Sequence, residues 1–271
     1  MTTLSGVWLP IVTPFHDGAV DFVSYEKLID HYIAAGVRGI FPLGTTGESP
    51  TLDDDESEAL VERTLEVVAG RVPVFVGIGG NSTAKTLKML RRLDQYDFAG
   101  IVSVCPYYNR PPQDGMREHF HRIAETTDRQ IVIYNIPYRT GVNLANDTLL
   151  ELAARPNIVG VKDSSGNLAQ SIELLRRRPA GFSVMTGEDN YYYTMLAHGG
   201  DGGSSLRRIS RRLLSSRSTS ACWQTIIAAR GGSGRGSKPW YRSCSAKRTR
   251  CLSSIAFGGR DCCARRNAAY P

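Results

Sequence analysis

The feature that most constrains this chain is an alternation of short apolar runs and amphipathic stretches, repeated roughly every 25–35 residues, about the length of one βα unit. Between the runs, Tyr25, Ile29 and Ile33 recur at the spacing of one buried helix face. The run at 72–76 is continuously apolar, as in a parallel strand buried on both sides. The pattern predicts a (β/α)8 barrel with an eighth strand beginning near Gly203. The seven preceding runs begin near Val7, Val37, Val72, Ile101, Ile131, Ile158 and Phe182.

A doubly wound sheet is the alternative fold for such a pattern. That fold usually carries a glycine-rich phosphate loop after its first strand. Here the first run continues into Thr13, Pro14 and Phe15, so the fingerprint is missing. We therefore favour the barrel, in which strand ends meet around one mouth and carry the reactive groups.

Lys162 and Tyr134 end two successive runs of this barrel. A lysine at the inner end of a buried strand loses hydration, which lowers its pKa and leaves a neutral amine able to form a Schiff base with a ketone. A phenol on the adjacent strand would lie close enough to move protons. The sequence leaves open that the lysine points to solvent and that the tyrosine is a packed aromatic residue.

Two other segments carry groups suited to a carboxylate ligand. The segment 44–47, Gly-Thr-Thr-Gly, offers two hydroxyl groups and closely approachable backbone N–H groups. Arg139 follows Pro137 on a loop near Tyr134 and would bind a carboxylate with two hydrogen bonds. An ordinary strand-to-helix turn and a solvated loop arginine remain the alternatives.

Together these segments resemble the dihydrodipicolinate synthase family, within the pyruvate-dependent Schiff-base aldolases that also include N-acetylneuraminate lyase. The matching segments keep the family's order and spacing over residues 1–203: Val-Thr-Pro-Phe at 12–15, Gly-Thr-Thr-Gly-Glu-Ser at 44–49, Pro-Tyr-Tyr-Asn at 106–109, Tyr-Asn-Ile-Pro at 134–137, Arg-Thr-Gly at 139–141 and Gly-Val-Lys-Asp at 160–163.

The resemblance implies condensation of pyruvate with L-aspartate 4-semialdehyde to 4-hydroxy-tetrahydrodipicolinate, towards lysine and diaminopimelate, with no metal or organic cofactor. It implies a cytoplasmic homotetramer built as a dimer of dimers. A sugar-acid lyase related to N-acetylneuraminate lyase, or an inactive homologue, is the alternative; Thr46 and Arg139 favour the synthase. The resemblance implies that Lys162 forms the Schiff base and that Tyr134 transfers protons, with a relay through Thr45 and the Tyr108 of a neighbouring subunit. It implies that Thr46 binds the carboxylate of pyruvate and that Arg139 binds the carboxylate of the semialdehyde. Gly187 would lie beside the substrate.

The resemblance also bears on regulation, because such synthases are often inhibited by lysine bound at a dimer interface. Asn81 and Tyr107 match that site. Lys85 stands where lysine-sensitive members carry an acidic residue. A cation there would repel the inhibitor's ammonium group, so we expect weak or absent lysine inhibition.

The composition changes sharply after Gly203. Residues 204–271 hold 15 basic residues and one acidic residue, whereas residues 1–203 hold 18 basic and 25 acidic residues. Five of the six cysteines also lie in this last stretch, and no family motif does. We therefore expect two parts, an incomplete barrel at 1–203 carrying the site and a disordered basic segment at 204–271 in place of strand eight and the terminal helices.

Three interpretations of the basic segment remain open: a shift of reading frame near codon 203, which we favour, a nucleic-acid-binding segment, and a zinc or disulfide module. Replacement of strand eight would leave strands one and seven with unpaired edges and destabilise the barrel.

No run is apolar for the roughly 18 residues that a membrane helix needs. The first basic residue is Lys27, so we expect no secretory signal and a cytoplasmic location.

Overall fold

The computed structural model describes residues 4–204 of the 271-residue chain, and these form a ring of parallel strands. The strand order is β4-β1-β10-β9-β8-β7-β6-β5. A parallel bridge between Ile40 and Val74 joins the two ends of that order and closes the ring. The (β/α)8 prediction is confirmed. The strands are β1 Gly6–Pro10, β4 Gly39–Phe41, β5 Phe75–Gly77, β6 Gly100–Val104, β7 Gln130–Asn135, β8 Ile158–Asp163, β9 Ser183–Thr186 and β10 Gly202–Ser204, with a small antiparallel pair β2 Phe15–His16 and β3 Ala19–Val20.

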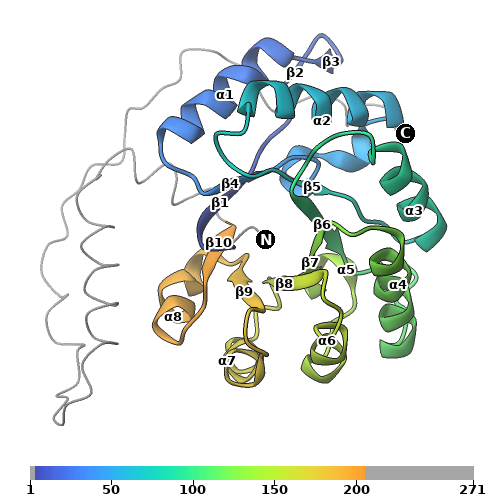
Figure 1. Ribbon diagram of the computed structural model, residues 1–271, viewed down its shortest axis with the longest axis vertical. Helices are drawn as coiled ribbons and strands as arrows, with labels where there is room; N and C mark the ends of the chain where they lie inside the picture. Colours follow the sequence, from blue (N-terminus) through green and yellow to red (C-terminus); the bar gives the residue numbers. More distant parts are fainter. Residues whose placement is uncertain (1–3, 205–271) are drawn as a thin grey trace, which may run out of the picture. The chain divides into compact units, whose positions relative to one another are not determined.

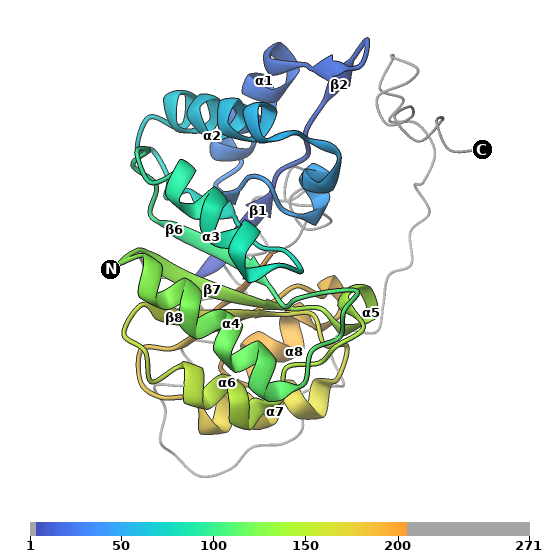
Figure 2. The same cartoon turned by 90° about the vertical axis from the view of Figure 1, so that its right-hand side faces the viewer.

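Helices surround the strands (Figure 1), and from the side α4, α6 and α7 lie along the outside of β6 to β8 (Figure 2). Tyr25 and Ile29, which were predicted to lie on one buried helix face, are both buried in helix α1. The helices are α1 Phe22–Ala34, α2 Asp54–Val68, α3 Thr83–Arg92, α4 Gln113–Thr126, α5 Pro137–Thr140, α6 Asn146–Leu152, α7 Leu168–Arg177 and α8 Tyr192–Ala197, with 3-10 turns η1 Thr45–Gly47, η2 Ser49–Thr51 and η3 Asp189–Tyr191.

Aromatic side chains fill the interior of the ring below the mouth. The ring of Trp8 stacks on Phe41 at 5.0 Å and meets Phe75 edge-on at 5.2 Å. Val132 belongs to the same inner cluster, whereas its neighbours Ile131 and Ile133 belong to the larger core between strands and helices. This alternation means that even-numbered residues of β7 face the interior and odd-numbered ones face the helices.

The eighth strand is present, which corrects one expectation. Strand β10 pairs with β1, where Gly202 lies opposite Gly6, and with β9, where Gly202 lies opposite Met185. The pairing uses backbone groups, and a Cβ on Gly202 would lie 2.1 Å from the carbonyl oxygen of Gly6. Unpaired edges on strands one and seven were therefore a wrong prediction, because three residues ending at Ser204 suffice to bridge them.

The remaining predictions for the basic segment concern residues 205–271, which lie outside the described residues. These are its disorder, its origin in a frame shift and its ligands.

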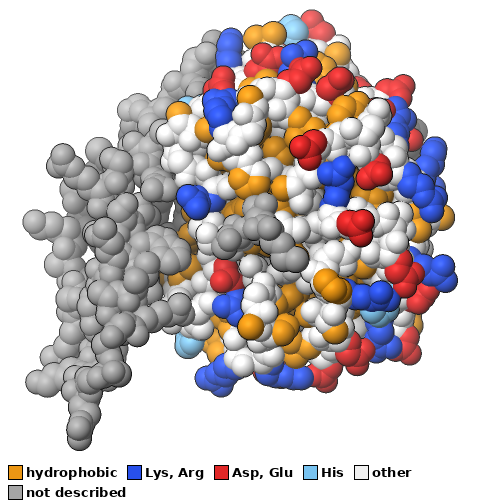
Figure 3. Space-filling model, viewed as in Figure 1, with side chains coloured by type: hydrophobic (Ala, Val, Ile, Leu, Met, Phe, Trp, Pro, Cys, Tyr) orange, Lys and Arg blue, Asp and Glu red, His pale blue; other side chains and the backbone are white. Residues whose placement is uncertain are grey.

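Within 4–204 the surface mixes both signs of charge. On the face seen in Figure 3, acidic and basic side chains lie intermixed, and hydrophobic ones show between them. None of the helices in this part of the chain combines the length and the apolar character needed to cross a membrane.

Candidate active site

Lys162 lies near the end of β8 and points into the mouth of the barrel. Only 8% of the residue is exposed, and its Nζ lies 4.2 Å from the centroid of the Tyr134 ring. Burial lowers the lysine pKa to about 8, and the nearby negative charge of Glu188 opposes this shift. The structure therefore places a partly neutral amine in a buried mouth and excludes the alternative of a solvent-facing lysine.

Tyr134 faces the same interior from β7, directly opposite Lys162 in the parallel register. Burial raises the pKa of Tyr134 to about 12, against a smaller opposing effect of a hydrogen bond with Ser164. The phenol thus stays protonated at neutral pH. Tyr134 can therefore transfer a proton only as part of a hydrogen-bonded relay, in which another group replaces the proton that the phenol gives up.

A cavity of about 480 Å³ opens at this mouth. Among the predicted site residues, Thr45, Tyr134, Arg139 and Lys162 line it. They come from the loop after β4, from β7, from α5 and from β8. Four segments that are far apart in sequence thus meet around one space of a size suited to small molecules.

The guanidinium of Arg139 lies at the exposed rim of the cavity. Its Cζ is 5.5 Å from the centroid of the Tyr138 ring. Within residues 4–204 it makes no hydrogen bond or ion pair with another side chain. Its five N–H donors are therefore open to a carboxylate ligand.

Three predicted residues, Thr46, Tyr108 and Gly187, are not among the residues that line the cavity. Thr46 is half-buried in η1, next to Thr45, but is not one of the lining residues. Tyr108 is 86% exposed and adopts a left-handed backbone conformation with φ of 70°. Its neighbour Tyr107 lines the cavity instead. The predicted contribution of Tyr108 to a neighbouring subunit stays a prediction, because it needs a second chain.

Gly187 follows β9 and packs against the site from the side. A Cβ there would lie 2.0 Å from the Ser164 hydroxyl oxygen and 3.2 Å from Lys162 Cε. The Gly187 N–H also donates to the carbonyl of Asp163 at 2.8 Å. Position 187 must lack a side chain for Lys162 to keep its place.

Sequence reasoning missed the carboxylate of Glu188. Its Oε1 is shielded from solvent and has no hydrogen-bond partner among the described residues. Burial raises the pKa of this carboxyl, as do Asp189 and Asp163, while Lys162 acts in the opposite direction. Its place directly after Gly187 at a strand end was the available signal.

Sequence reasoning also assigned no role to Asn135 and Asp163, the residues after Tyr134 and Lys162. Both are buried. Asp163 has a raised pKa because of burial, against hydrogen bonds that favour its charged form. Strand-end polar residues are visible in sequence, but their burial behind the site is not.

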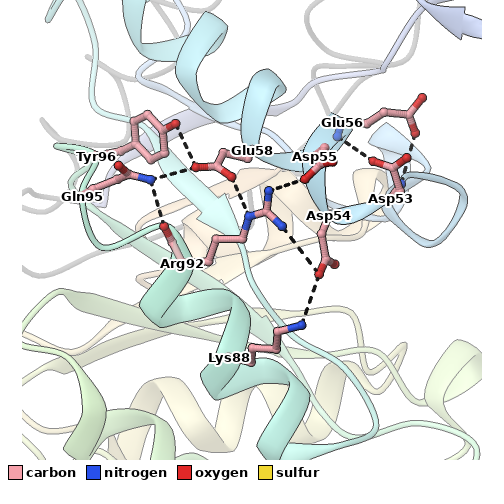
Figure 4. Close-up of polar contacts among 9 residues, drawn as sticks. All are labelled: Asp53, Asp54, Asp55, Glu56, Glu58, Lys88, Arg92, Gln95 and Tyr96. Atoms are coloured by element: carbon pink, nitrogen blue, oxygen red, sulfur yellow. Dashed lines mark hydrogen bonds and ion pairs between the residues drawn. The ribbon is translucent and has the colours of Figure 1, made fainter.

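The far side of the cavity lies between α2 and α3. Asn81 and Tyr107, which the resemblance assigns to a lysine site, line it together with Lys85, the residue expected to weaken lysine binding. Arg92 of α3 ties the two helices together through Asp55 and Glu58 of α2. The polar network is completed by Lys88 with Asp54, and by Gln95 and Tyr96 with Glu58 (Figure 4).

No group of three or more His, Cys, Asp or Glu side chains in residues 4–204 is placed to hold a metal ion. The one cysteine in that range, Cys105, is buried, and burial raises the pKa of its thiol to about 12.

Comparison with known proteins agrees with this geometry. The sequence model of the dihydrodipicolinate synthetase family matches residues 3–210. The chain is 54% identical over 200 residues to 4-hydroxy-tetrahydrodipicolinate synthase 2 of Clostridium acetobutylicum, an alignment covering 74% of this chain and 70% of that one.

Solved structures give the same result. The fold superposes on the crystal structure of dihydrodipicolinate synthase from Thermotoga maritima with a TM-score of 0.78 at 38% identity, covering 85% of this chain and 80% of that one. The structure of a monomeric dihydrodipicolinate synthase variant matches with a TM-score of 0.77 at 39% identity, and the match covers 84% of this chain and 77% of that one.

Proposed function

The chain belongs to the dihydrodipicolinate synthetase family, and from this premise we propose that it condenses pyruvate with L-aspartate 4-semialdehyde through a Schiff base on Lys162 to give 4-hydroxy-tetrahydrodipicolinate. The observation that carries the proposal is the buried Nζ of Lys162, 4.2 Å from the Tyr134 ring in a cavity that Arg139 also lines. The reaction belongs to the biosynthesis of lysine and diaminopimelate.

The first step needs an uncharged amine. With a pKa of about 8, about a tenth of Lys162 is neutral at pH 7, against roughly 0.03% for an ordinary lysine. The amine adds to the keto carbon of pyruvate, and the resulting carbinolamine loses water to form the imine. Loss of a proton from the pyruvate methyl group then gives the enamine.

The second half forms the carbon–carbon bond. The enamine carbon attacks the aldehyde carbon of the semialdehyde, and the aldehyde oxygen takes up a proton. The substrate's own amino group then adds to the imine carbon and displaces Lys162, which closes the ring and frees the enzyme. We assign the proton transfers to Tyr134, with Thr45 and the Tyr108 of a second copy as its relay.

The two carboxylates are assigned to different groups. Thr46 and its backbone would bind the carboxylate of pyruvate, with Gly187 leaving room beside Lys162. Arg139 would bind the carboxylate of the semialdehyde, since its guanidinium is open at the rim. The cation at this position favours the synthase over a sugar-acid lyase, whose polyhydroxylated substrate needs a neutral neighbour.

The assembly is proposed as a homotetramer, a dimer of dimers, in the cytoplasm. The exposed Tyr108 supports a second copy, because a side chain that is 86% exposed reaches no proton relay within its own chain. A monomeric variant among the related structures means that the fold itself does not require assembly.

Borohydride trapping tests the proposal. Reduction in the presence of pyruvate should attach one reduced pyruvate to Lys162, located by peptide mass spectrometry. Lys162→Ala should abolish the adduct. Lys85→Ala, which removes another lysine lining the same cavity, should keep it and serves as the matched control.

An unlabelled wild-type chain, or undiminished labelling of Lys162→Ala, would contradict the proposal. The first of these results would indicate an inactive homologue. Turnover with a sugar acid but not with the semialdehyde would instead favour the lyase.

A further inference from the structure

Asn135 and Asp163 follow Tyr134 and Lys162 in two paired strands. They lie opposite each other in the register, as the two site residues do. Because side chains alternate along a strand, the site residues face the mouth and the following pair faces the helix layer. Both are deeply buried, with 2% and 6% of their surface exposed.

The Asp163 carboxylate is held on all sides. Its Oδ1 accepts from the backbone N–H of Ser165 at 3.0 Å. Its Oδ2 accepts from the hydroxyl groups of Ser165, at 3.2 Å, and of Ser171 on α7. Its backbone carbonyl also accepts the Gly187 N–H. Asp163 thus ties the end of β8 to helix α7 and to the end of β9.

Asn135 uses both ends of its amide in a parallel way. Its Nδ2 donates to Asn143 Oδ1 at 2.9 Å, and its Oδ1 accepts from the backbone N–H of Leu144 at 3.1 Å. The side chain of Asn143 in turn donates to Gln170 on α7 at 2.9 Å. The ends of β7 and β8 are therefore both anchored to consecutive residues of one helix, Gln170 and Ser171.

This polar layer occupies a place that barrels usually fill with apolar side chains. Burying a carboxylate and an amide is unfavourable unless every group finds a partner. All four terminal atoms of Asn135 and Asp163 have one. A simpler hydrophobic contact would hold a strand to a helix without defining its position along the strand axis.

We propose that Asn135 and Asp163 are positioning residues, which anchor the ends of β7 and β8 to α7 and thereby hold Lys162 Nζ against the Tyr134 ring. The inference rests on the proposed Schiff-base function of Lys162. Neither residue touches the reacting atoms, so both act through the placement of their neighbours. Displacement of a reacting group by about 1 Å is enough to lower a rate roughly 100-fold.

The test is the rate of pyruvate adduct formation at saturating pyruvate, quenched with borohydride at timed intervals, on the full chain. Asp163→Ala removes the side-chain hydrogen bonds with Ser165, Ser171 and Asn135, and should slow the rate at least tenfold. Asp163→Asn keeps the shape and can exchange donor and acceptor with the two serine hydroxyls, so it should stay within about threefold of wild type.

The control is Asn167→Ala. Asn167 is the N-cap of α7, where its side chain accepts from the Gln170 N–H. The substitution weakens the same helix without touching either strand end. It should lower the melting temperature as Asp163→Ala does, yet leave the rate per folded molecule unchanged.

Equal rates in Asp163→Ala, Asn167→Ala and wild type would overturn the proposal and leave these residues a purely stabilising role. If Asp163→Ala does not fold, Ser171→Ala removes a single donor to the carboxylate; it should slow the rate at least threefold, and an unchanged rate would overturn the proposal. Absence of any adduct in the wild-type chain would instead refute the proposed function.

Discussion

A methyl group at position 187 should displace the proposed nucleophile. The Cβ of Gly187→Ala would lie 2.0 Å from Ser164 Oγ, whereas ordinary contact begins at 3.4 Å. The hydroxyl must therefore retreat by more than an ångström, although Ser164 is buried. The same Cβ lies 3.2 Å from Lys162 Cε, so the lysine chain must also give way by a few tenths of an ångström.

Both displacements reach the reacting groups, since Ser164 hydrogen bonds with Tyr134. Overpacking of this kind costs about 1–3 kcal/mol of stability. A shift of the amine approaching 1 Å would lower the rate by up to ~100-fold, so we expect Gly187→Ala to form the pyruvate adduct about 10- to 100-fold more slowly than wild type.

The assay is borohydride-quenched adduct formation, normalised to folded protein by circular dichroism. Gly80→Ala is the matched control, because its Cβ would meet only Thr86 Oγ1, at 3.6 Å. The double variant Gly187→Ala/Ser164→Ala removes the 2.0 Å contact and should recover part of the rate. A Gly187→Ala rate within twofold of wild type, or an equal loss in Gly80→Ala, would refute the reasoning.

Three further results are expected. In steady-state assays, Arg139→Ala should raise KM for the semialdehyde about 10- to 100-fold and leave KM for pyruvate unchanged, because it deletes a charge-assisted hydrogen bond that contributes about 1.5–3 kcal/mol. An unchanged KM for the semialdehyde would show that Arg139 does not bind this substrate. L-Lysine should inhibit weakly or not at all because Lys85 repels its ammonium group, and a sub-millimolar inhibition constant would end that idea. Tyr25→Phe should lower the free energy of unfolding in urea by about 1 kcal/mol, because it deletes the 2.8 Å hydrogen bond to buried Thr64, and no change would show that the bond contributes nothing net.

The strands and the reactive ends of β7 and β8 could be predicted because they depend on local pattern. Apolar runs mark buried strands, and Tyr134 and Lys162 were assigned to strand ends from those runs alone. Strand boundaries were less well predicted. The run beginning at Val72 forms its first bridge at Val74, with Ile40, and β5 itself begins at Phe75, three residues later than the run.

The eighth strand shows where composition misleads. The break after Gly203 led to the expectation of missing strand pairs, yet Gly202 and Gly203 pair with both neighbours. Strand pairing depends on backbone groups and on close approach, which glycine permits. A change of side-chain composition beyond the strand does not remove these interactions.

The layer behind the site could not be predicted from sequence. Asn135 meets Asn143, and Asp163 meets Ser171, only after register and helix packing are known. The same holds for Glu188, whose buried oxygen is visible only in three dimensions. Long-range packing, rather than any local motif, brings these groups together.

The pH dependence of adduct formation tests the central claim most directly. The amine is reactive only when neutral, and burial places the pKa of Lys162 at about 8. The rate at a fixed low pyruvate concentration should rise about tenfold per pH unit below that value and level off above it. A rate that keeps rising through pH 10, as for an ordinary lysine with a pKa of 10.5, or an adduct on any other residue, would contradict the account.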